Sequence, residues 1–348
     1  MKIIVVDFAA KTGGAISILQ SFYHYLVDSC DKNEWLFLLN DHYIKDTSNI
    51  KTIILKKEKK SWWNRLVFDL FLGRKLVREL NADAIFYLQN TLIRGVHIPQ
   101  IMYMDQSLSF QKEKQFSFFK RDERIYAIYQ YIIGKLNHEA CKKAEYTIVQ
   151  TEWLKKAIKE QCNILDDRVI KISPNESLLC RKYHAETVIQ TEFFYPASNA
   201  IYKNHLCIYE ALSQLEESCN VVLTIPNQEG LPKQCKCIGS ISPEEVYSRM
   251  ENSILLFPSY IESFGLPLKE AMEIGTIILA ADTLFAREIL SGYENAYFFK
   301  TFCPSDLANL MRKVIIGDIV HIPQVRGEYK KEENAWEKVV RIIRSVQK

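Results

Sequence analysis

The chain has 348 residues, which is too long for one ordinary hydrophobic core and suits two domains of roughly 150 to 190 residues each. Its 48% apolar and 25% charged residues are typical of a globular protein and exclude the disordered and fibrous classes. The net charge is only +3, but residues 1–190 carry 29 Lys and Arg against 22 Asp and Glu, whereas residues 191–348 carry 16 against 20. The positive charge therefore lies in the first half.

The first half alternates short apolar runs with amphipathic stretches. Strands are predicted at residues 2–8, 34–39, 51–55, 83–88, 99–104, 145–150 and 168–172. Helices are predicted at residues 13–30, 62–79, 119–142 and 151–161. We interpret the first apolar run as a buried strand rather than a signal peptide, because Lys11-Thr-Gly-Gly soon interrupts it. The alternation predicts a parallel sheet covered by helices.

An irregular stretch from about residue 173 reads as a linker, and the pattern then restarts. Strands are predicted at residues 192–196, 220–225, 235–241, 253–258, 276–280 and 295–299, and helices at 203–216, 243–251, 267–274, 283–290 and 305–316. We therefore predict an α/β protein with two doubly wound, Rossmann-like domains, residues 1–185 and 186–330. A last amphipathic helix in residues 331–348 could pack on either domain and could cross back to the first.

One stretch, "YIESFGLPLKEAMEIG" at residues 260–275, combines a turn, a helix start and two carboxylates directly after a predicted strand. Pro267 suits the first helical turn and Gly275 suits the helix end. In open parallel sheets, ligands bind beyond the carboxyl ends of the strands, where a loop leads into a helix. The stretch is therefore the first candidate for a binding site.

Three backbone N–H groups at this helix start are predicted to face an anion, and the helix dipole adds positive potential. They belong to Phe264, Gly265 and Leu266. A phosphate is the expected guest. Glu262 and Glu270 lie on either side of the same opening and repel phosphates, so their useful partners are hydroxyl groups. A ligand with central phosphates and a hydroxylated ring on each side is a nucleotide sugar.

The same residues resemble a known family. "ESFGLPLKEAMEIGTIILAAD" resembles the E-x7-E signature of retaining glycosyltransferases of the GT-B fold, in the GT4 family (glycosyl transferases group 1), with Glu262 and Glu270 as the two glutamates. "GGAISIL", "AEYTIVQTEW" and "FFYPASNAIYKNH" resemble other parts of that family. The resemblance implies an N-terminal acceptor-binding domain and a C-terminal donor-binding domain that face a central cleft. It places Glu262 near the donor sugar and Glu270 near the ribose.

The resemblance also implies a cation for the donor diphosphate. Lys203 matches the family's lysine, which stabilises the charge on the leaving nucleotide; the alternative is a solvated lysine at a helix start. The family's arginine some five residues earlier is replaced here by Ser198. Ser198 is kept as a donor-binding candidate, although one phosphate contact is then missing or comes from elsewhere.

Two further candidates lie in the first half. Gly13 and Gly14 follow the first strand, where the backbone can approach the donor, or where they simply form a tight turn. Asp105 stands in "PQIMYMDQSLSF", which resembles the family's His-Asp stretch with Met104 in place of the histidine. Asp105 is a catalytic candidate that could hold an acceptor hydroxyl or the donor sugar, or that could cap a loop.

Neither cofactor nor metal is expected. The seven histidines have no ligand spacing and no Asp-x-Asp carboxylate pair is present. The nine cysteines are odd in number without a CxxC pair, which argues against a disulfide framework and a structural zinc site. They indicate a cytoplasmic protein.

The predicted function is therefore transfer of a sugar from a nucleotide-sugar donor to a hydroxyl of a glycan or lipid-linked saccharide, with retention of configuration, in the assembly of a cell-surface polysaccharide or lipopolysaccharide. The alternatives are a nucleotide-sugar epimerase or hydrolase of similar fold and a catalytically silent nucleotide-sugar-binding protein. No nucleic-acid partner is expected.

A basic stretch at residues 56–78 is a candidate for peripheral contact with the inner face of the membrane. It has a local charge balance of +6 and contains Trp62 and Trp63. The alternative is a core helix with Leu66, Phe68, Leu70 and Leu72 facing inward.

Overall fold

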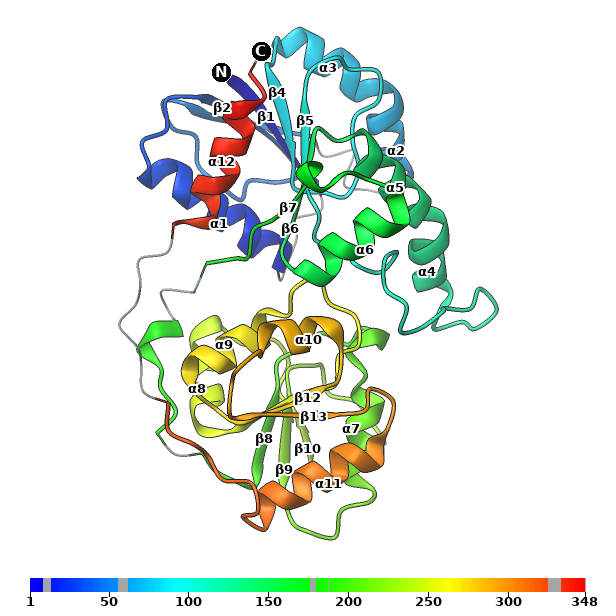
Figure 1. Ribbon diagram of the computed structural model, residues 1–348, viewed down its shortest axis with the longest axis vertical. Coiled ribbons are helices and arrows are strands. Elements are labelled where there is room, and N and C mark those ends of the chain that lie inside the picture. Colours follow the sequence, from blue (N-terminus) through cyan, green and yellow to red (C-terminus); the bar gives the residue numbers. More distant parts are fainter. Residues whose placement is uncertain (9–13, 56–61, 176–179, 187, 325–332, 348) are drawn as a thin grey trace. The chain divides into compact units, whose positions relative to one another are not determined.

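The computed structural model describes residues 1–8, 14–55, 62–175, 180–186, 188–324 and 333–347 (Figure 1). The chain divides into two compact units. Unit 1 comprises residues 1–111, 126–174 and 332–348, and unit 2 comprises residues 112–125 and 175–331.

Unit 1 is built on a seven-stranded sheet in the order β3-β2-β1-β4-β5-β6-β7, in which all neighbouring strands are parallel. The strands are β1 (Lys2–Asp7), β2 (Glu34–Leu39), β3 (Ile50–Ile54), β4 (Ala84–Tyr87), β5 (Gln100–Tyr103), β6 (Tyr146–Val149) and β7 (Val169–Lys171). The order reverses between β1 and β4, which is the arrangement of a doubly wound fold with its ligand crevice at that point.

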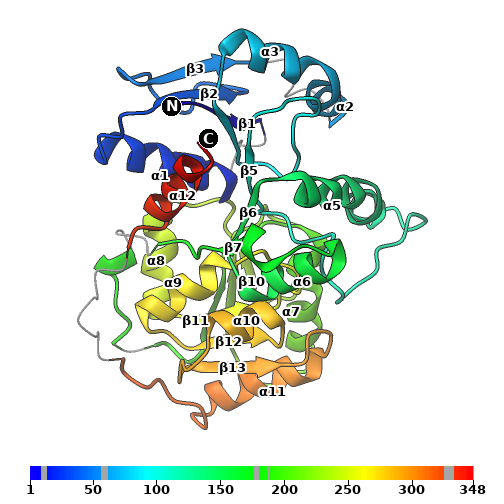
Figure 2. The same cartoon turned by 45° about the horizontal axis from the view of Figure 1, so that its top comes forward.

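Helices cover both faces of this sheet (Figures 1 and 2). They are α1 (Gly14–Asp28), α2 (Trp62–Val67), α3 (Gly73–Leu80), α4 (Arg124–Ala127), α5 (Gly134–Lys143), α6 (Glu152–Cys162) and α12 (Ala335–Ser345), with π-helices η1 (Phe68–Leu72) and η2 (Ile128–Ile133). Alternate residues of β1 point to opposite faces: Ile3 and Val5 pack with α1 and α12, and Ile4 and Val6 pack with the helices of the other face. The predicted alternation of strands and helices follows from this burial.

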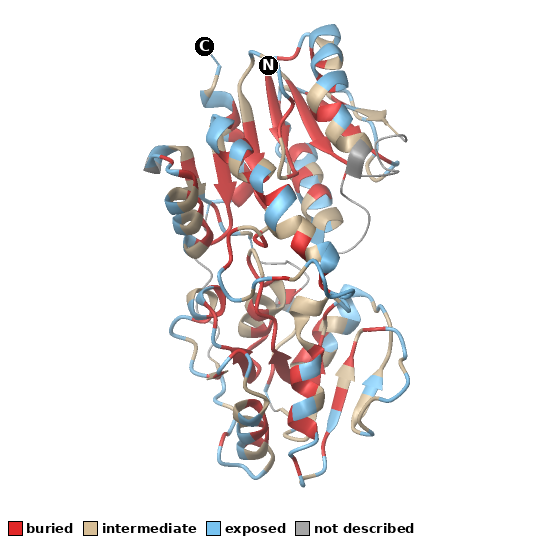
Figure 3. Cartoon of the chain, turned by 90° about the vertical axis from the view of Figure 1, so that its right-hand side faces the viewer, coloured by how far each residue is buried: buried red, intermediate tan, exposed pale blue. Residues whose placement is uncertain are grey.

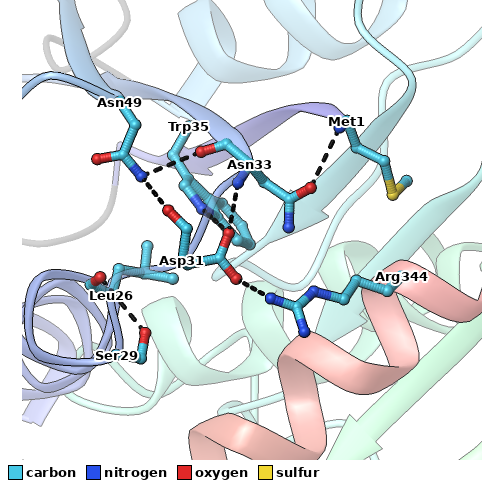
Figure 4. Close-up of polar contacts among 8 residues, drawn as sticks. All are labelled: Met1, Leu26, Ser29, Asp31, Asn33, Trp35, Asn49 and Arg344. Atoms are coloured by element: carbon cyan, nitrogen blue, oxygen red, sulfur yellow. Dashed lines mark hydrogen bonds and ion pairs between the residues drawn. The ribbon is translucent and has the colours of Figure 1, made fainter.

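The C-terminal helix α12 is part of the core of unit 1. The Trp336 ring lies 4.9 Å from the Phe22 ring of α1. At the other end of α12, Arg344 pairs with the buried carboxylate of Asp31, which also accepts a hydrogen bond from Trp35 Nε1 at 3.2 Å (Figure 4). The two ends of the chain's sequence are therefore joined within one unit.

The predicted helix at residues 62–79 forms as α2, η1 and α3, but its inward face differs from the prediction. Phe68 is buried, whereas Val67, Phe71 and Leu72 are exposed, with Leu72 at 52%. The expectation that Leu72 faces inward is wrong, because the π-helical turn of η1 holds more residues per turn than an α-helix and shifts the facing of the residues that follow.

The predicted helix at residues 119–142 begins only at Arg124. The segment before it is held as a loop by the carboxylate of Glu123, which accepts a hydrogen bond from the Ser117 N–H at 2.9 Å and pairs with Lys114 at 3.0 Å. These contacts replace the helical hydrogen bonds that the predicted start would require.

Unit 2 has a six-stranded parallel sheet in the order β10-β9-β8-β11-β12-β13. Its strands are β8 (Glu192–Tyr195), β9 (Asn220–Leu223), β10 (Cys235–Cys237), β11 (Ile254–Phe257), β12 (Ile278–Ala281) and β13 (Ala296–Phe299). Its helices are α7 (His205–Leu212), α8 (Pro243–Asn252), α9 (Leu266–Ile274), α10 (Leu284–Ile289) and α11 (Pro304–Ile315). The strand order reverses between β8 and β11, so this unit is also doubly wound.

Burial follows the same rule in each unit: the inner strands are largely buried, the edge strands β3, β10 and β13 are more exposed, and the helices have a buried face and an exposed face (Figure 3). The helix predicted at residues 203–216 is shorter, since Ile201–Lys203 forms a 3-10 turn and Asn204, with φ of 57°, precedes the first residue of α7. Among the described residues, no helix combines the length and apolar character needed to cross a membrane.

Candidate functional site

The candidate site lies in unit 2, where the strand order reverses. β8 and β11 are neighbours in the sheet, and the loops that follow them lie at the same edge. The loop after β8 carries Lys203, and the loop after β11 carries Glu262. The topology thus brings together two residues that are 59 positions apart in the sequence.

Lys203 and Glu262 form an ion pair, with 2.5 Å between Lys203 Nζ and Glu262 Oε1. Both side chains are mostly buried, at 16% and 15% exposure. Ser259 Oγ donates a hydrogen bond to the same carboxylate oxygen at 2.7 Å. The hydroxyl of Tyr195, at the end of β8, donates to the Lys203 carbonyl at 2.9 Å and lies 3.3 Å from Ser259 Oγ. The pair is therefore fixed from both loops.

Ser259 and Tyr195 were not predicted from the sequence. Ser259 lies three residues before Glu262, and Tyr195 is the last residue of the strand that precedes Lys203. These positions in the sequence are only a weak indication that the two residues belong to the site. Their role depends on the contact between β8 and β11, which no local pattern specifies.

The turn between β11 and α9 adopts the conformation that its glycine permits. Gly265 has φ of +93°, which is strained for any residue with a side chain. It precedes the first residue of α9 and offers no side-chain cap. Because Pro267 has no N–H and the Leu268 N–H donates to the Gly265 carbonyl at 3.0 Å, the N–H groups that can face an anion are those before Pro267. Phe264 is buried beneath the turn. Gly275, with φ of +96°, ends the helix as predicted.

Glu270 lies in the second turn of α9. Its Oε1 accepts a hydrogen bond from the Tyr247 hydroxyl of α8 at 2.9 Å, and the Tyr183 ring lies 5.7 Å from the Tyr247 ring. Burial raises the pKa of the Glu270 carboxyl, and the hydrogen bond from Tyr247 opposes this effect. Tyr247, like Ser259 and Tyr195, was not predicted from the sequence.

A buried histidine stands next to Lys203. Burial, with the nearby charge of Lys203, lowers the pKa of His205 to about 4, and its ring lies 5.1 Å from the Tyr195 ring. His205 is therefore neutral near pH 7, and the positive charge at this position is that of Lys203. Ser198 is exposed in the loop between β8 and the 3-10 turn.

The candidates of the first half lie in unit 1. Gly13 is outside the described residues. Gly14 begins α1, and a Cβ there would meet no atom within 4 Å. Asp105 follows β5, and its Oδ1 accepts a hydrogen bond from Asn90 Nδ2 at 2.7 Å. Burial raises the pKa of the Asp105 carboxyl, while the bond from Asn90 acts in the other direction. Met104, which replaces the histidine of the family pattern, is fully buried.

Within the described part of the chain, no group of three or more His, Cys, Asp or Glu side chains is placed to hold a metal ion.

Residues 192–333 match the family described as Glycosyl transferases group 1, and this range contains Lys203, Glu262 and Glu270. The match and the solved structures described next confirm the predicted resemblance. A comparison with curated proteins finds no significant match.

Several solved structures share the fold at low sequence identity. Anabaena Alr3699/HepE, in complex with UDP and glucose, is 16% identical with a TM-score of 0.64, and the match covers 90% of each chain. Sucrose-phosphate synthase from Thermosynechococcus elongatus is 13% identical with a TM-score of 0.68, over 91% of this chain and 90% of that one. WaaG, a glycosyltransferase involved in lipopolysaccharide biosynthesis, is 13% identical with a TM-score of 0.68, over 90% of each chain. The predicted GT-B architecture of two Rossmann-like domains is confirmed.

Proposed function

We propose that this chain, whose residues 192–333 belong to the glycosyl transferases group 1, is a retaining glycosyltransferase that moves a sugar from a nucleotide-sugar donor to a hydroxyl of a saccharide acceptor. The acceptor is a glycan or a lipid-linked saccharide in the assembly of a cell-surface polysaccharide or lipopolysaccharide. The observation that carries the proposal is the Lys203–Glu262 pair beside the uncapped start of α9, with Glu270 further along the same helix.

Each part of this arrangement suits one part of a nucleotide sugar. The N–H groups at the start of α9, from Phe264 to Leu266, would hold the diphosphate together with Lys203. Glu262 would accept hydrogen bonds from the sugar hydroxyls, and Glu270 from the ribose hydroxyls. Gly14 in unit 1 and Ser198 would be secondary donor contacts, as would Gly13, which lies outside the described residues.

The chemical step requires charge stabilisation more than a proton donor. The bond from the anomeric carbon to the diphosphate breaks, and a bond to the acceptor oxygen forms on the same face of the sugar. The proton of the acceptor hydroxyl goes to the leaving phosphate. Lys203 stabilises the growing negative charge in a largely buried site, where such contacts are strong. Asp105 would hold an acceptor hydroxyl or the donor sugar.

Two other functions use the same donor site. A nucleotide-sugar epimerase or hydrolase would act on the donor without an acceptor, and a silent binding protein would hold it without turnover; Met104 and Ser198, which depart from the family pattern, favour the latter. We propose that neither a metal nor another cofactor takes part, that the protein is cytoplasmic, and that residues 56–78 contact the membrane.

The test is a panel of nucleotide sugars incubated with the full chain and a mixture of saccharide acceptors, with release of nucleoside diphosphate as the measurement. We expect release from at least one donor, insensitive to EDTA, and at least roughly 10²-fold slower in Lys203→Ala, because one preorganised contact to the leaving group is lost. Release that depends on acceptor supports transfer, and release without acceptor supports hydrolysis. Binding of donors without release by the wild type would contradict an enzymatic role.

A further inference from the structure

Unit 1 contains a small pocket of about 90 Å³, with apolar and polar lining residues, that the proposed donor chemistry does not use. It lies where β4 and β5 end, between α2–η1 on one side and η2–α5 on the other. Its polar lining includes Arg65, Asp69, Asn90, Gln106 and Asn137. The carboxyl ends of parallel strands are where ligands bind in such sheets.

Asn137 is the unusual member of this lining. It lies within α5 and is only 1% exposed, yet neither its Nδ2 nor its Oδ1 finds a hydrogen-bond partner among the described residues. A buried amide left without partners costs about 1 to 3 kcal/mol. Most buried polar groups are paired, so an orphaned one indicates that water or a ligand group belongs there.

Arg65 offers a second orphaned group. One of its terminal nitrogens donates to the Phe8 carbonyl at 3.3 Å, but its buried Nε has no partner within the described structure. By contrast, Asp69 is satisfied on both oxygens, by the Tyr87 hydroxyl at 2.7 Å and the Thr91 hydroxyl at 2.8 Å. Among the buried side-chain atoms of the lining, those without a partner in the described structure are thus Arg65 Nε and the amide Nδ2 and Oδ1 of Asn137.

The unpaired atoms of Arg65 and Asn137 indicate which kind of ligand group fits the pocket. A phosphate or carboxylate would accept from the donors, but it would leave the Asn137 oxygen without a donor and would lie near the carboxyl of Asp69. A hydroxyl both donates and accepts, so it can satisfy both sides of the Asn137 amide. The volume suits a few water molecules, or the hydroxymethyl or diol part of one sugar ring, and is too small for a nucleotide.

The pocket is joined to a residue of the proposed reaction. Asn90, which lines the pocket, donates through Nδ2 to Asp105 at 2.7 Å and accepts through Oδ1 from the Asp105 N–H at 3.1 Å. Gln106, the next residue, also lines the pocket. A sugar hydroxyl held there would lie close to Asp105.

We propose that this pocket binds a hydroxyl-bearing part of the saccharide acceptor and that Asn137, with Arg65, determines which acceptor is taken. The proposal rests on the glycosyltransferase function proposed above. Asn137 would then act in binding, since its amide makes no hydrogen bond that stabilises the described structure.

The variant Asn137→Leu separates binding from stability, because leucine has a similar size and no polar atoms. The free protein should melt at the same or a higher temperature, since an unpaired buried amide is removed. Binding of methyl glycosides of glucose, galactose, mannose and N-acetylglucosamine to the full chain, measured by saturation-transfer NMR, should be detectable for at least one sugar and at least roughly tenfold weaker in the variant. Arg65→Lys, which keeps the charge but loses Nε–H, should weaken the binding of the same sugar.

Asn40→Leu is the matched control in the same unit. Asn40 is also 1% exposed, but its amide is paired, donating to the Phe8 carbonyl at 2.7 Å and accepting from the Tyr43 hydroxyl at 3.0 Å. This variant should melt at a lower temperature. A variant Asn137→Leu that loses stability as Asn40→Leu does and binds the glycosides like the wild type would show that the pocket holds only water, and so would a wild type that binds no glycoside. Release of nucleoside diphosphate by the wild type in the presence of the acceptor mixture decides separately whether the proposed function stands, because acceptor-dependent release together with glycoside binding that Asn137→Leu leaves unchanged would uphold the function and refute the role of the pocket.

Discussion

Replacing Glu262 by glutamine would remove the negative charge that holds Lys203 in the ligand-free protein. The two side chains are 2.5 Å apart and about 15% exposed, so the diphosphate of a donor must compete with the Glu262 carboxylate for Lys203. Glutamine keeps the shape and still offers an oxygen to Lys203 and Ser259. The perturbation is therefore confined to the charge.

The expected gain in nucleotide affinity follows from the strength of the contact that is weakened. A hydrogen bond between charged groups contributes about 1.5 to 3 kcal/mol net, and glutamine retains part of it. If the charge accounts for about 1.4 kcal/mol, nucleoside diphosphates should bind Glu262→Gln roughly tenfold more tightly than the wild type. Turnover of the sugar donor should fall at the same time, because the sugar hydroxyls lose a charged acceptor.

Isothermal titration calorimetry with UDP, GDP and ADP measures the affinity, and nucleotide release from the matching sugar donor measures turnover. Glu270→Gln is the matched control, because the Glu270 carboxylate accepts a hydrogen bond from Tyr247 and pairs with no cation among the described residues. This control should weaken nucleotide binding through the ribose. Equal or weaker diphosphate binding by Glu262→Gln would refute the view that Glu262 and the diphosphate compete for Lys203.

Two further predictions concern unit 1. Burial raises the pKa of Asp69 from 3.8 to about 6, so the ionised carboxylate lowers the stability of the folded protein by up to about 3 kcal/mol above pH 6, and this cost disappears as the pH falls towards 4. The melting temperature of the wild type, measured relative to that of Asp69→Asn, should therefore rise as the pH is lowered from 7.5 to 4.5. A difference that stays constant over this range would contradict the raised pKa. If residues 56–78 contact a membrane, the full chain should co-sediment with anionic liposomes at low salt and lose this binding at high salt or on charge reversal of Lys56, Lys57, Lys59 and Lys60, which lie outside the described residues; sedimentation that ignores those four lysines would disprove the role of this stretch.

The order of helices and strands could be read from the sequence because burial imposes its own periodicity on each element. β1 alternates between two core faces, and α9 begins after a residue with positive φ and ends at another, so Gly265 and Gly275 mark it locally. Two doubly wound domains followed from that order, and the GT-B fold from the resemblance of the E-x7-E stretch to its family. The E-x7-E spacing similarly placed Glu262 before α9 and Glu270 within it.

Other features depended on contacts that hydrophobic periodicity does not reveal. The start of the helix after residue 119 was wrong because the Glu123 carboxylate accepts a hydrogen bond from the Ser117 N–H, six residues earlier, and holds this segment as a loop. The inward position of Leu72, part of the alternative interpretation of residues 62–79, was wrong because the π-helix η1 shifts the residues that follow it. The sequence also could not predict that the Asn137 amide is buried without hydrogen-bond partners among the described residues, since an asparagine within a helical pattern gives no sign of its burial.

The sequence by itself determined which segments become strands and helices, and which residue types lie at the loop after each strand, because propensity and hydrophobic period act over a few residues. Only the tertiary structure decided that Lys203 meets Glu262 across 59 positions and that Arg344 meets Asp31 across 313. These two contacts result from the order of strands in the sheet of unit 2 and from the packing of α12 on unit 1, and both depend on the burial of whole faces of the sheets. The chemistry of the candidate site therefore resides in residues that the sequence names and in a pairing that only the fold provides.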